Sequence, residues 1–291
     1  MQTLTEDAFA AAERYLLLHA RLVDRLRYAH AFQSAPGELV RGAVAAYQNL
    51  DGGFGNAIEP DLRGAGSQPQ GVEVALWMLE GIGEGAGPMV QRACDWLAAN
   101  STEDGGVPWV LPNVLDDPRG PWWQPAGEQP PAALNPTAPV VGLLTARGID
   151  HPWLGPATEF CWKALAELTE ISAYDALCAL AFLERAADRE RAEAEFARLR
   201  EGLRAVAALD PDAPGHVHSP LDLAPRPDAL ARSLFSGEEI DRSLDALIAS
   251  QNEDGGWAPN FEMWTPVVVH EWGGYLTLAN LKILKAYGRI A

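Results

Sequence analysis

Two consecutive glycines preceded by an aspartate occur three times in this chain, and each copy follows a stretch of helical periodicity. The copies are QNLDGGFG at 48–55, NSTEDGGVPW at 100–109 and QNEDGGW at 251–257. Glycine adopts positive φ angles without steric cost, so an Asp-Gly-Gly turn can end a helix and reverse the chain within a few residues. The turns therefore predict short helices joined by tight reversals.

The spacing of these turns indicates an internal repeat. Gln48 and Asn100 are 52 residues apart, and Asn100 and Gln251 are 151 residues apart. Both spacings fit a unit of about 50 residues, which has room for two helices and two turns. Six such units account for the 291 residues. We expect degenerate copies within 137–236, where Gly148, Pro152 and Pro211 supply the turns.

Apolar residues recur at three- and four-residue steps through most of the chain, as in amphipathic helices. Ser236, followed by acids, is typical of a helix N-cap, and Thr137 after Pro136 marks another helix start. The periodic stretches are 9–26, 70–83, 87–99, 155–169, 172–187, 188–208, 237–250 and 267–287.

The absence of long apolar–polar alternation favours an all-α fold. We predict a single domain, residues 1–291, in which six helix pairs close into an (α/α)6 barrel. Inner helices would run parallel to one another, and outer helices would surround them. An open solenoid is the competing architecture.

Composition and charge limit the classes of partner. With 48% hydrophobic residues and a formal charge of -18, the chain is globular and repels phosphate backbones and anionic membranes at long range. We therefore expect no nucleic-acid partner, although a local arginine cluster could still hold a small phosphorylated ligand.

The cysteines and the hydropathy pattern bear on the compartment. Cys94, Cys161 and Cys178 are odd in number and widely spaced, so they predict core thiols of a reducing cytosol rather than disulfides or a metal knuckle. The N-terminal residues lack a leader pattern, and no run of about 18 apolar residues occurs. The expected location is cytoplasmic, without a transmembrane segment.

The third turn carries a resemblance to a known family. Residues 251–257 fit the Q-x3-G-x-W core of the QW repeats of squalene–hopene cyclases, with Arg242 and Leu247-Ile248 at matching upstream places. The 48–54 copy has Phe for Trp, and the 100–109 copy fits loosely. The chain resembles a single-toroid member of the terpenoid cyclase and protein prenyltransferase superfamily. That resemblance implies six helix pairs and structural turns, in which the glutamine ties helix ends and the aromatic residue stacks.

The resemblance also implies where to look for a proton donor. Class II cyclases of this family protonate an olefin with an Asp of a D-x-D-D motif, which is missing here. Asp116 and Asp117 form the nearest string; they could share a proton or form only an acidic loop tip.

A second group of candidates follows the first Gly-Gly turn, at Glu59, Asp61 and Arg63. Pairing with Arg63 would lower the pKa of Asp61 and leave Glu59 as the better acid, and a purely structural salt bridge is the competing interpretation.

Aromatic side chains are the expected substrate-binding surface, because ring faces stabilise carbocations; core filling is the alternative role of each. The predicted substrate-binding residues are Arg63, Trp77, Trp122, Trp123, Trp264, His270, Trp272 and Tyr275.

His270 precedes an aromatic-rich last helix, as the zinc histidine does in protein prenyltransferases. The D-x-C partner is missing, and a site of His270, Glu271 and Glu262 would lack sulfur, so we expect neither metal nor cofactor. His216 and His218 form an H-x-H without an identifiable third ligand.

Three functions remain open on the sequence. The first is acid-initiated cyclisation or isomerisation of an isoprenoid or polyene in the barrel, with Glu59 or Asp61 as acid. The second is a non-catalytic toroid that binds an apolar ligand or serves as a scaffold. The third is a transferase acting on prenyl diphosphates, which needs a basic cluster at one mouth. A homodimer is compatible with each of the three.

Overall fold

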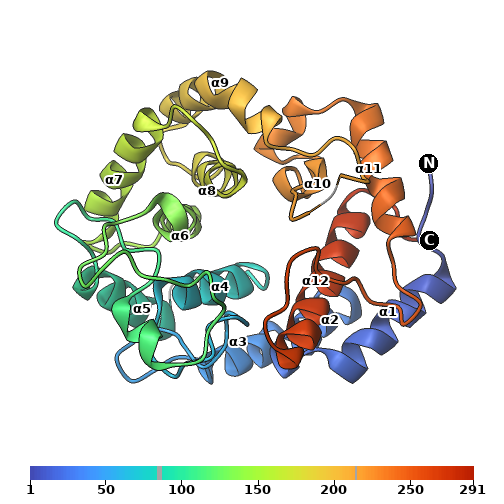
Figure 1. Cartoon of the computed structure of the whole chain (residues 1–291), viewed down its shortest axis with the longest axis horizontal. Coiled ribbons are helices and arrows are strands. Elements are labelled where there is room, and N and C mark those ends of the chain that lie inside the picture. The colour runs from blue at the N-terminus through green and yellow to red at the C-terminus, as the bar shows by residue number, and fades with distance from the viewer. Residues whose placement is uncertain (84–86, 214) are drawn as a thin grey trace. The chain divides into compact units, whose positions relative to one another are not determined.

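The computed structural model describes residues 1–83, 87–213 and 215–291, which fold into helices without any strand (Figure 1). This confirms the all-α prediction. Contacts divide the chain into two compact units: unit 1 comprises Met1–Ala35 and Leu199–Ala291, and unit 2 comprises Pro36–Arg198. The expectation of one domain over 1–291 stays a prediction.

Unit 2 contains six complete helices, a 3-10 helix and most of a further helix, α9 (Arg189–Ala205), which continues into unit 1. The others are α3 (Gly37–Ala45), α4 (Pro69–Glu80), α5 (Pro88–Ala99), η1 (Pro112–Asp116), α6 (Leu134–Ala146), α7 (Leu154–Glu167) and α8 (Ala173–Leu183).

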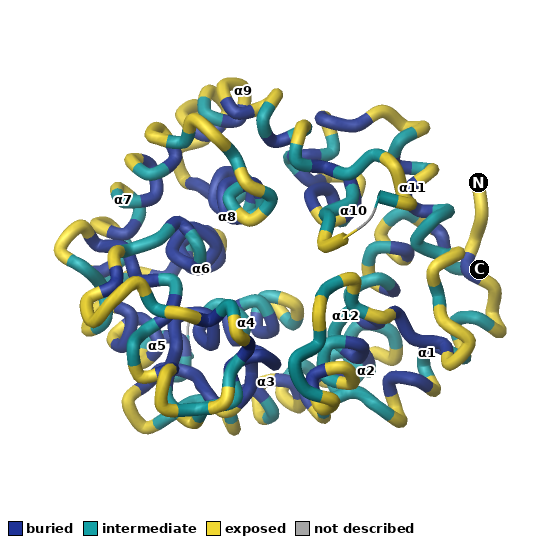
Figure 2. The backbone as a smooth tube through the Cα atoms, in the orientation of Figure 1, coloured by how far each residue is buried: buried dark blue, intermediate teal, exposed yellow. Residues whose placement is uncertain are grey.

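Helix α6 is the centre of unit 2 and packs on α4, α7 and α8. Its residues from Pro136 to Leu144 are all buried, which Figure 2 shows as an almost continuous dark helix. Gly142 allows α6 to approach α8 closely, because a Cβ there would lie 2.6 Å from the carbonyl oxygen of Ala181. Helix α6 therefore lies between α4 and α8 in this unit and contacts both.

Unit 1 contains α1 (Glu6–His19), α2 (Leu22–Gln33), α10 (Pro220–Leu223), η2 (Leu230–Leu234), α11 (Gly237–Ala249) and α12 (Pro266–Ala286). Helix α12 packs against both α1 and α2.

The two ends of the chain lie side by side within unit 1. Leu4 N–H donates to the carbonyl of Arg289 at 2.8 Å, and Ala291 N–H donates to the carbonyl of Leu4 at 3.1 Å. The buried Arg289 guanidinium pairs with Asp241 at 2.8 Å and Asp245 at 2.9 Å, both on α11. The first and last residues are thus fixed by main-chain and charged contacts.

The three Asp-Gly-Gly turns have the same geometry. The first glycine of each pair has a φ between +90° and +97°, at Gly52, Gly105 and Gly255. In each turn the N–H of the first glycine donates to the carbonyl of the residue three positions earlier. The N–H of that earlier residue donates in turn to the carbonyl of the second glycine, and all these distances are 2.9–3.0 Å. The aspartate Oδ1 accepts the N–H of the second glycine at 2.9–3.3 Å. The shared sequence therefore encodes one turn conformation.

Each turn also packs on the helix two places further along. A Cβ added to Gly52 would meet the carbonyl of Arg92 in α5, and one added to Gly105 would meet Pro156 in α7. In unit 1 the turn after α11 packs in the same way on α1, where Gly255 adjoins Ala11.

The glutamines reinforce this docking. Gln48 Nε2 donates to the carbonyl of its own Gly52 and to that of Met89 in α5, both at 2.8 Å. Gln251 does the same with Gly255 at 2.8 Å and Ala8 of α1 at 2.9 Å.

One predicted helix is wrong, because the structure has two helices in its place. The stretch 9–26 breaks into α1 and α2 at Ala20 and Arg21, whose ψ angles of 152° and 154° are extended. Neither Gly nor Pro marks this break. Its tertiary partner is Gly274 of α12, since a Cβ there would lie 2.6 Å from the Ala20 Cβ. By contrast the N-cap at Ser236 is confirmed, with a capping box to Glu239.

Candidate functional site

The first group of predicted acids is buried in the loop after the first turn. Glu59 is 6% exposed and Asp61 is 2% exposed. Glu59 Oε2 accepts the Asp61 N–H at 2.7 Å, and Arg63 Nη1 donates to the carbonyl of Pro60 at 3.3 Å. Both contacts hold the loop in shape.

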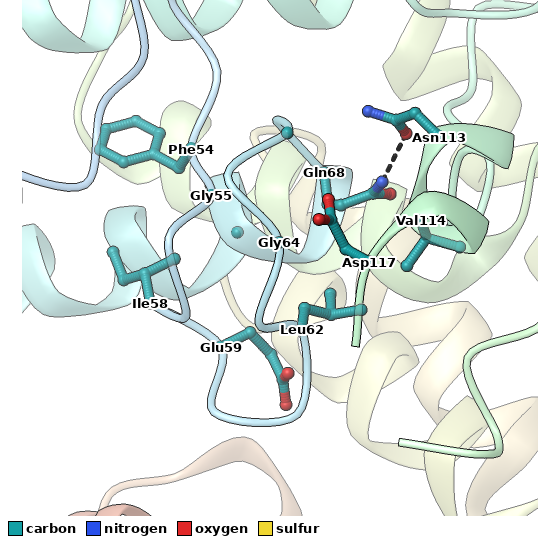
Figure 3. Close-up of a pocket in the computed structure, with 12 residues that line it drawn as sticks. Phe54, Gly55, Ile58, Glu59, Leu62, Gly64, Gln68, Asn113, Val114 and Asp117 are labelled. Carbon is teal, nitrogen blue, oxygen red and sulfur yellow. Dashed lines mark hydrogen bonds between the residues drawn. The ribbon is translucent and has the colours of Figure 1, made fainter. Parts of the chain in front are cut away.

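A small cavity adjoins this loop, and its lining includes Glu59, Gln68, Asn113 and Asp117 (Figure 3). At about 10 Å³ it has room for a single water molecule and not for an organic substrate. In Figure 3 the Asp117 carboxylate lies near Gln68, whereas Glu59 points to the other side of the loop. Glu59 and Asp117, one from each group of predicted acids, thus line the same small cavity, but their carboxylates point in different directions.

The outer acid of the second pair is on the surface: Asp116 ends η1 and is exposed, while Asp117 is half-buried. Gly64 is needed beside Asp117, because a Cβ at Gly64 would collide with the Asp117 carboxylate.

Tyr174, in the first turn of α8, is the neighbour of the buried acids that sequence reasoning missed. Burial and the negative charges of Glu59 and Asp61 raise the pKa of Tyr174, although about half of the residue is exposed. Tyr174 therefore lies within electrostatic reach of both carboxylates, at the start of α8.

A third carboxyl, which sequence reasoning also missed, lies on α4. Glu73 keeps some accessible surface, yet its carboxyl lies deep among protein atoms, and burial raises its pKa to about 7. The indole Nε1 of Trp77, one turn further along α4, donates to Glu73 Oε1 at 3.3 Å, which lowers the pKa only in part. Burial therefore favours the protonated form of Glu73, which is the form that a general acid requires.

The other Glu73 oxygen faces the amide of Gln70, one turn earlier on α4. With the amide nitrogen turned toward Glu73, it lies 3.0 Å from Oε2, and the amide oxygen then lies 3.3 Å from the indole Nε1 of Trp109. This orientation satisfies both neighbours, because an indole N–H can only donate. The side-chain amide of Asn135, near the start of α6, lies 2.8 Å from that of Gln70, and in this orientation it turns its own nitrogen to the Gln70 oxygen.

Helix α8 contributes the remaining neighbours of Glu73 and Trp77. Cys178 is buried, and its pKa is raised well above the usual value by burial first and then by the charge of Glu73. At the end of α8, Arg185 lies 5.0 Å from the Trp77 ring centroid and pairs with Glu80 at 3.0 Å. Residues from α4, α6 and α8 therefore surround one carboxyl and one indole.

The predicted tryptophans of unit 2 belong to two environments. Trp77 is partly exposed beside Glu73. Trp123 is buried with Leu62, Val110 and Val114, while Trp122 and Trp109 pack on this cluster. The Trp109 and Trp123 ring centroids are 4.9 Å apart. Trp123 is thus core filling, whereas Trp109 connects this core to Gln70.

The other predicted substrate-binding residues lie in unit 1. Trp272 makes edge contacts with Tyr275 at 5.5 Å and Phe261 at 5.4 Å, and Trp264 is partly exposed. His270 is exposed and stacks on His19 at 5.1 Å. The structure brings Trp272 and Tyr275 into one aromatic group, whereas the ring of His270 stacks on that of His19.

A second hollow in unit 2, of about 500 Å³, lies where α6 and α8 end and α7 and α9 begin. Trp162 and Phe182 form its apolar part, and the guanidinium of Arg191 covers the Trp162 ring at 4.4 Å. None of the predicted residues lines it.

Residues 1–83, 87–213 and 215–291 contain neither a metal-binding cluster nor a membrane-spanning helix. No group of three or more His, Cys, Asp or Glu side chains is placed to hold a metal ion. No helix in these ranges is both long and apolar enough to cross a bilayer.

Comparison with known proteins supports the fold alone. No family model matches the chain, and no curated protein matches it. Among solved structures, the crystal structure of a protein from Actinoplanes is similar, with a TM-score of 0.62 and 18% sequence identity. The similarity covers 97% of this chain and 100% of that one. The chain therefore shares its helical architecture with a protein from Actinoplanes.

Proposed function

We propose that this protein is an acid catalyst of the class II terpene cyclase type, in which Glu73 protonates a carbon–carbon double bond of an isoprenoid or polyene. The observation that carries the proposal is the environment of Glu73: a deep carboxyl with a pKa of about 7, flanked by the Trp77 indole. A carboxyl of ordinary pKa would be ionised at neutral pH and could not deliver a proton.

The chemistry needs one proton and no other reagent. The Glu73 O–H bond breaks as the proton joins one alkene carbon, which leaves a carbocation on the other and a carboxylate on Glu73. In a cyclisation a second double bond then attacks the cation and forms the new carbon–carbon bond. A C–H bond next to the cationic carbon finally breaks, its electrons form a double bond, and its proton returns to the Glu73 carboxylate; without ring closure the same proton loss gives an isomerisation. The Trp77 indole adjoins Glu73, and we assign its ring face opposite Arg185 to stabilising the cation.

Glu73 replaces Glu59 and Asp61 as the preferred acid for a geometric reason. The cavity beside Glu59 holds no more than a water molecule, so an alkene has no room there. Glu73 retains accessible surface on α4.

We also propose that the helices form a closed (α/α)6 toroid. Two series of contacts support this arrangement. In both series a helix, or the turn that follows it, contacts the second helix further along the chain. Even-numbered helices pack as α4 on α6, α6 on α8 and α12 on α2. The Asp-Gly-Gly turns dock on α5, α7 and, from α11, back on α1. An open solenoid has no such return from the last repeat to the first.

The three buried, unpaired cysteines support a reducing location such as the cytoplasm. Pairing of two copies of the chain stays a prediction.

The test is product formation by the purified protein. We would incubate it with farnesyl and geranylgeranyl diphosphate, squalene and polyprenyl-aromatic compounds, and search by mass spectrometry for isomeric products. Glu73→Gln is expected to abolish turnover, and Glu73→Asp to retain part of it.

Parallel assays of Glu59→Gln and Asp61→Asn decide between the two assignments. If either variant loses turnover while Glu73→Gln stays fully active, the acid is Glu59 or Asp61 and not Glu73. Binding of an apolar compound without conversion would instead favour the non-catalytic toroid. Release of diphosphate with transfer of the prenyl group would favour the transferase.

A further inference from the structure

The Glu73 carboxyl is connected to Trp109 through a single amide. Gln70 is 6% exposed and lies between the two, 3.0 Å from Glu73 Oε2 and 3.3 Å from Trp109 Nε1. Trp109 belongs to the segment after the second Asp-Gly-Gly turn, and Gln70 and Glu73 belong to α4. Two separate parts of unit 2 therefore meet at this amide.

The orientation of the Gln70 amide affects the proton on Glu73. An amide nitrogen facing Oε2 donates to the ionised carboxylate and favours loss of the proton. An amide oxygen facing Oε2 accepts from the protonated carboxyl and favours retention of the proton. The Trp109 N–H favours the amide oxygen on its own side, because it offers a donor only. The Asn135 amide, 2.8 Å from that of Gln70, carries both a donor and an acceptor, so it can turn to match either orientation.

We propose that Trp109 is a positioning residue that acts through Gln70 to set how readily Glu73 gives up its proton. With Trp109 in place, Gln70 presents its nitrogen to the carboxylate. When the Trp109 indole moves away, the amide is free to turn, and Glu73 holds its proton more strongly. The inference deepens the proposed function: it makes the Trp109 segment a regulator of the same acid.

The groups described above around Glu73, all within residues 1–83 and 87–213, do not titrate in the relevant range. Trp77 on α4 and Asn135 on α6 carry no titratable proton near neutral pH. Cys178 on α8 is the titratable neighbour, and burial keeps its thiol neutral because its pKa is well above the usual value. A pH-dependent signal near Glu73 therefore reports the carboxyl itself.

The experiment measures the ionisation midpoint of Glu73 directly, without a substrate. The protein is labelled with ¹³C at the glutamate carboxyl carbon, and Glu73→Gln identifies the Glu73 resonance. Trp109→Phe keeps the ring and removes the N–H, and it is expected to raise the midpoint by about one pH unit. Gln70→Leu is expected to raise it at least as much.

The matched control is Trp123→Phe. Trp123 packs on Trp109 with ring centroids 4.9 Å apart, so this change disturbs the same aromatic cluster and leaves the Gln70 contact in place. Its midpoint is expected to equal that of the wild type. A double variant, Gln70→Leu with Trp109→Phe, should show no more shift than Gln70→Leu alone, because the effect of Trp109 passes through the amide.

A lowered or unchanged midpoint in Trp109→Phe would overturn the proposal, as would additive shifts in the double variant. If Gln70→Leu does not fold, the comparison of Trp109→Phe with Trp123→Phe still decides. Turnover tests the proposed function separately. If Trp109→Phe shifts the midpoint but Glu73→Gln is still active, Glu73 is not the acid, while the effect of Trp109 on Glu73 through Gln70 still holds.

Discussion

The side-chain amide of Gln251 donates a hydrogen bond at 2.9 Å to the carbonyl of Ala8, 243 residues earlier in the chain. The same nitrogen also donates to Gly255 at 2.8 Å, so one amide closes its own turn and joins it to α1. Gln48 makes the corresponding pair of bonds in unit 2.

Gln251→Leu is expected to lower the free energy of unfolding by about 1–3 kcal/mol, because two partly buried carbonyls lose their donor. Urea denaturation followed by far-UV circular dichroism measures the change. Gln129→Leu, at an exposed loop position, is the control and should stay within about 0.5 kcal/mol of the wild type. Equal stability of the two variants would contradict a tying role for Gln251.

Gly255→Ala should destabilise the same turn for a different reason. Gly255 has a φ of +92°, and an added Cβ would collide with the carbonyl of Ala11. We expect a loss of at least about 2 kcal/mol from strain and overlap together.

Two other glycines separate the causes of that loss. Gly288→Ala shares the positive φ, at +65°, but meets no atom within 4 Å, so it reports strain alone. Gly237→Ala, at the start of α11, has neither problem and should be neutral or stabilising. A Gly255→Ala protein as stable as Gly288→Ala would show that the packing on α1 does not matter.

Stability should fall as the pH rises through the range in which Glu73 ionises. Its pKa is about 7 in the folded protein against 4.5 for the ordinary side chain, so between these values the folded state binds more protons than the unfolded state. The stabilising contribution of the protonated carboxyl is complete below pH 4.5 and is lost as the pH rises through 7. The loss is about 3 kcal/mol for a shift of this size.

Unfolding of Glu73→Gln in urea at pH 5 and pH 8 measures this contribution. The variant is expected to gain stability over the wild type at pH 8 and little at pH 5, because glutamine remains neutral at both. An identical pH dependence of the two proteins would mean that Glu73 ionises as it does in the unfolded chain.

The thiols should be unreactive in the folded protein. All three cysteines are buried and unpaired, and burial raises the pKa of Cys94 to about 12 and those of Cys161 and Cys178 as well. Because the thiolate is the nucleophile, Ellman's reagent at pH 8 should label the chain only as fast as it unfolds. Rapid labelling of one thiol without urea would reveal an opening near that cysteine.

Local chemistry made much of the fold predictable. The Asp-Gly-Gly turns depend on a positive φ that few residues other than glycine adopt, and their conformation follows from adjacent residues. The N-cap at Ser236 is local for the same reason. The break between α1 and α2 was not predictable in this way, because it depends on Gly274 of α12, which is more than 250 residues away in the sequence.

The site was less predictable than the fold. Glu59 and Asp61 stand out in the sequence because they cluster, whereas Glu73 is a lone acid within an apolar helix, EVALW at 73–77. The pattern was visible: an acid followed by a tryptophan four residues later shares one helix face with it. The raised pKa was not, because it requires the burial that packing around α4, α6 and α8 produces.

Leu4 pairs with Arg289 and Ala291, so residues from the two ends of the chain are neighbours in the folded protein. The same helix contacts could therefore form in a chain that starts at a different helix. A short peptide joining residue 291 to residue 1 would span a small gap, so the chain could be opened at the exposed 126–129 loop and still form the same contacts. Such a circular permutant would place both new ends beside the Trp122–Trp123 loop, far in sequence from α12. It would thereby show whether this architecture needs a particular starting helix at all.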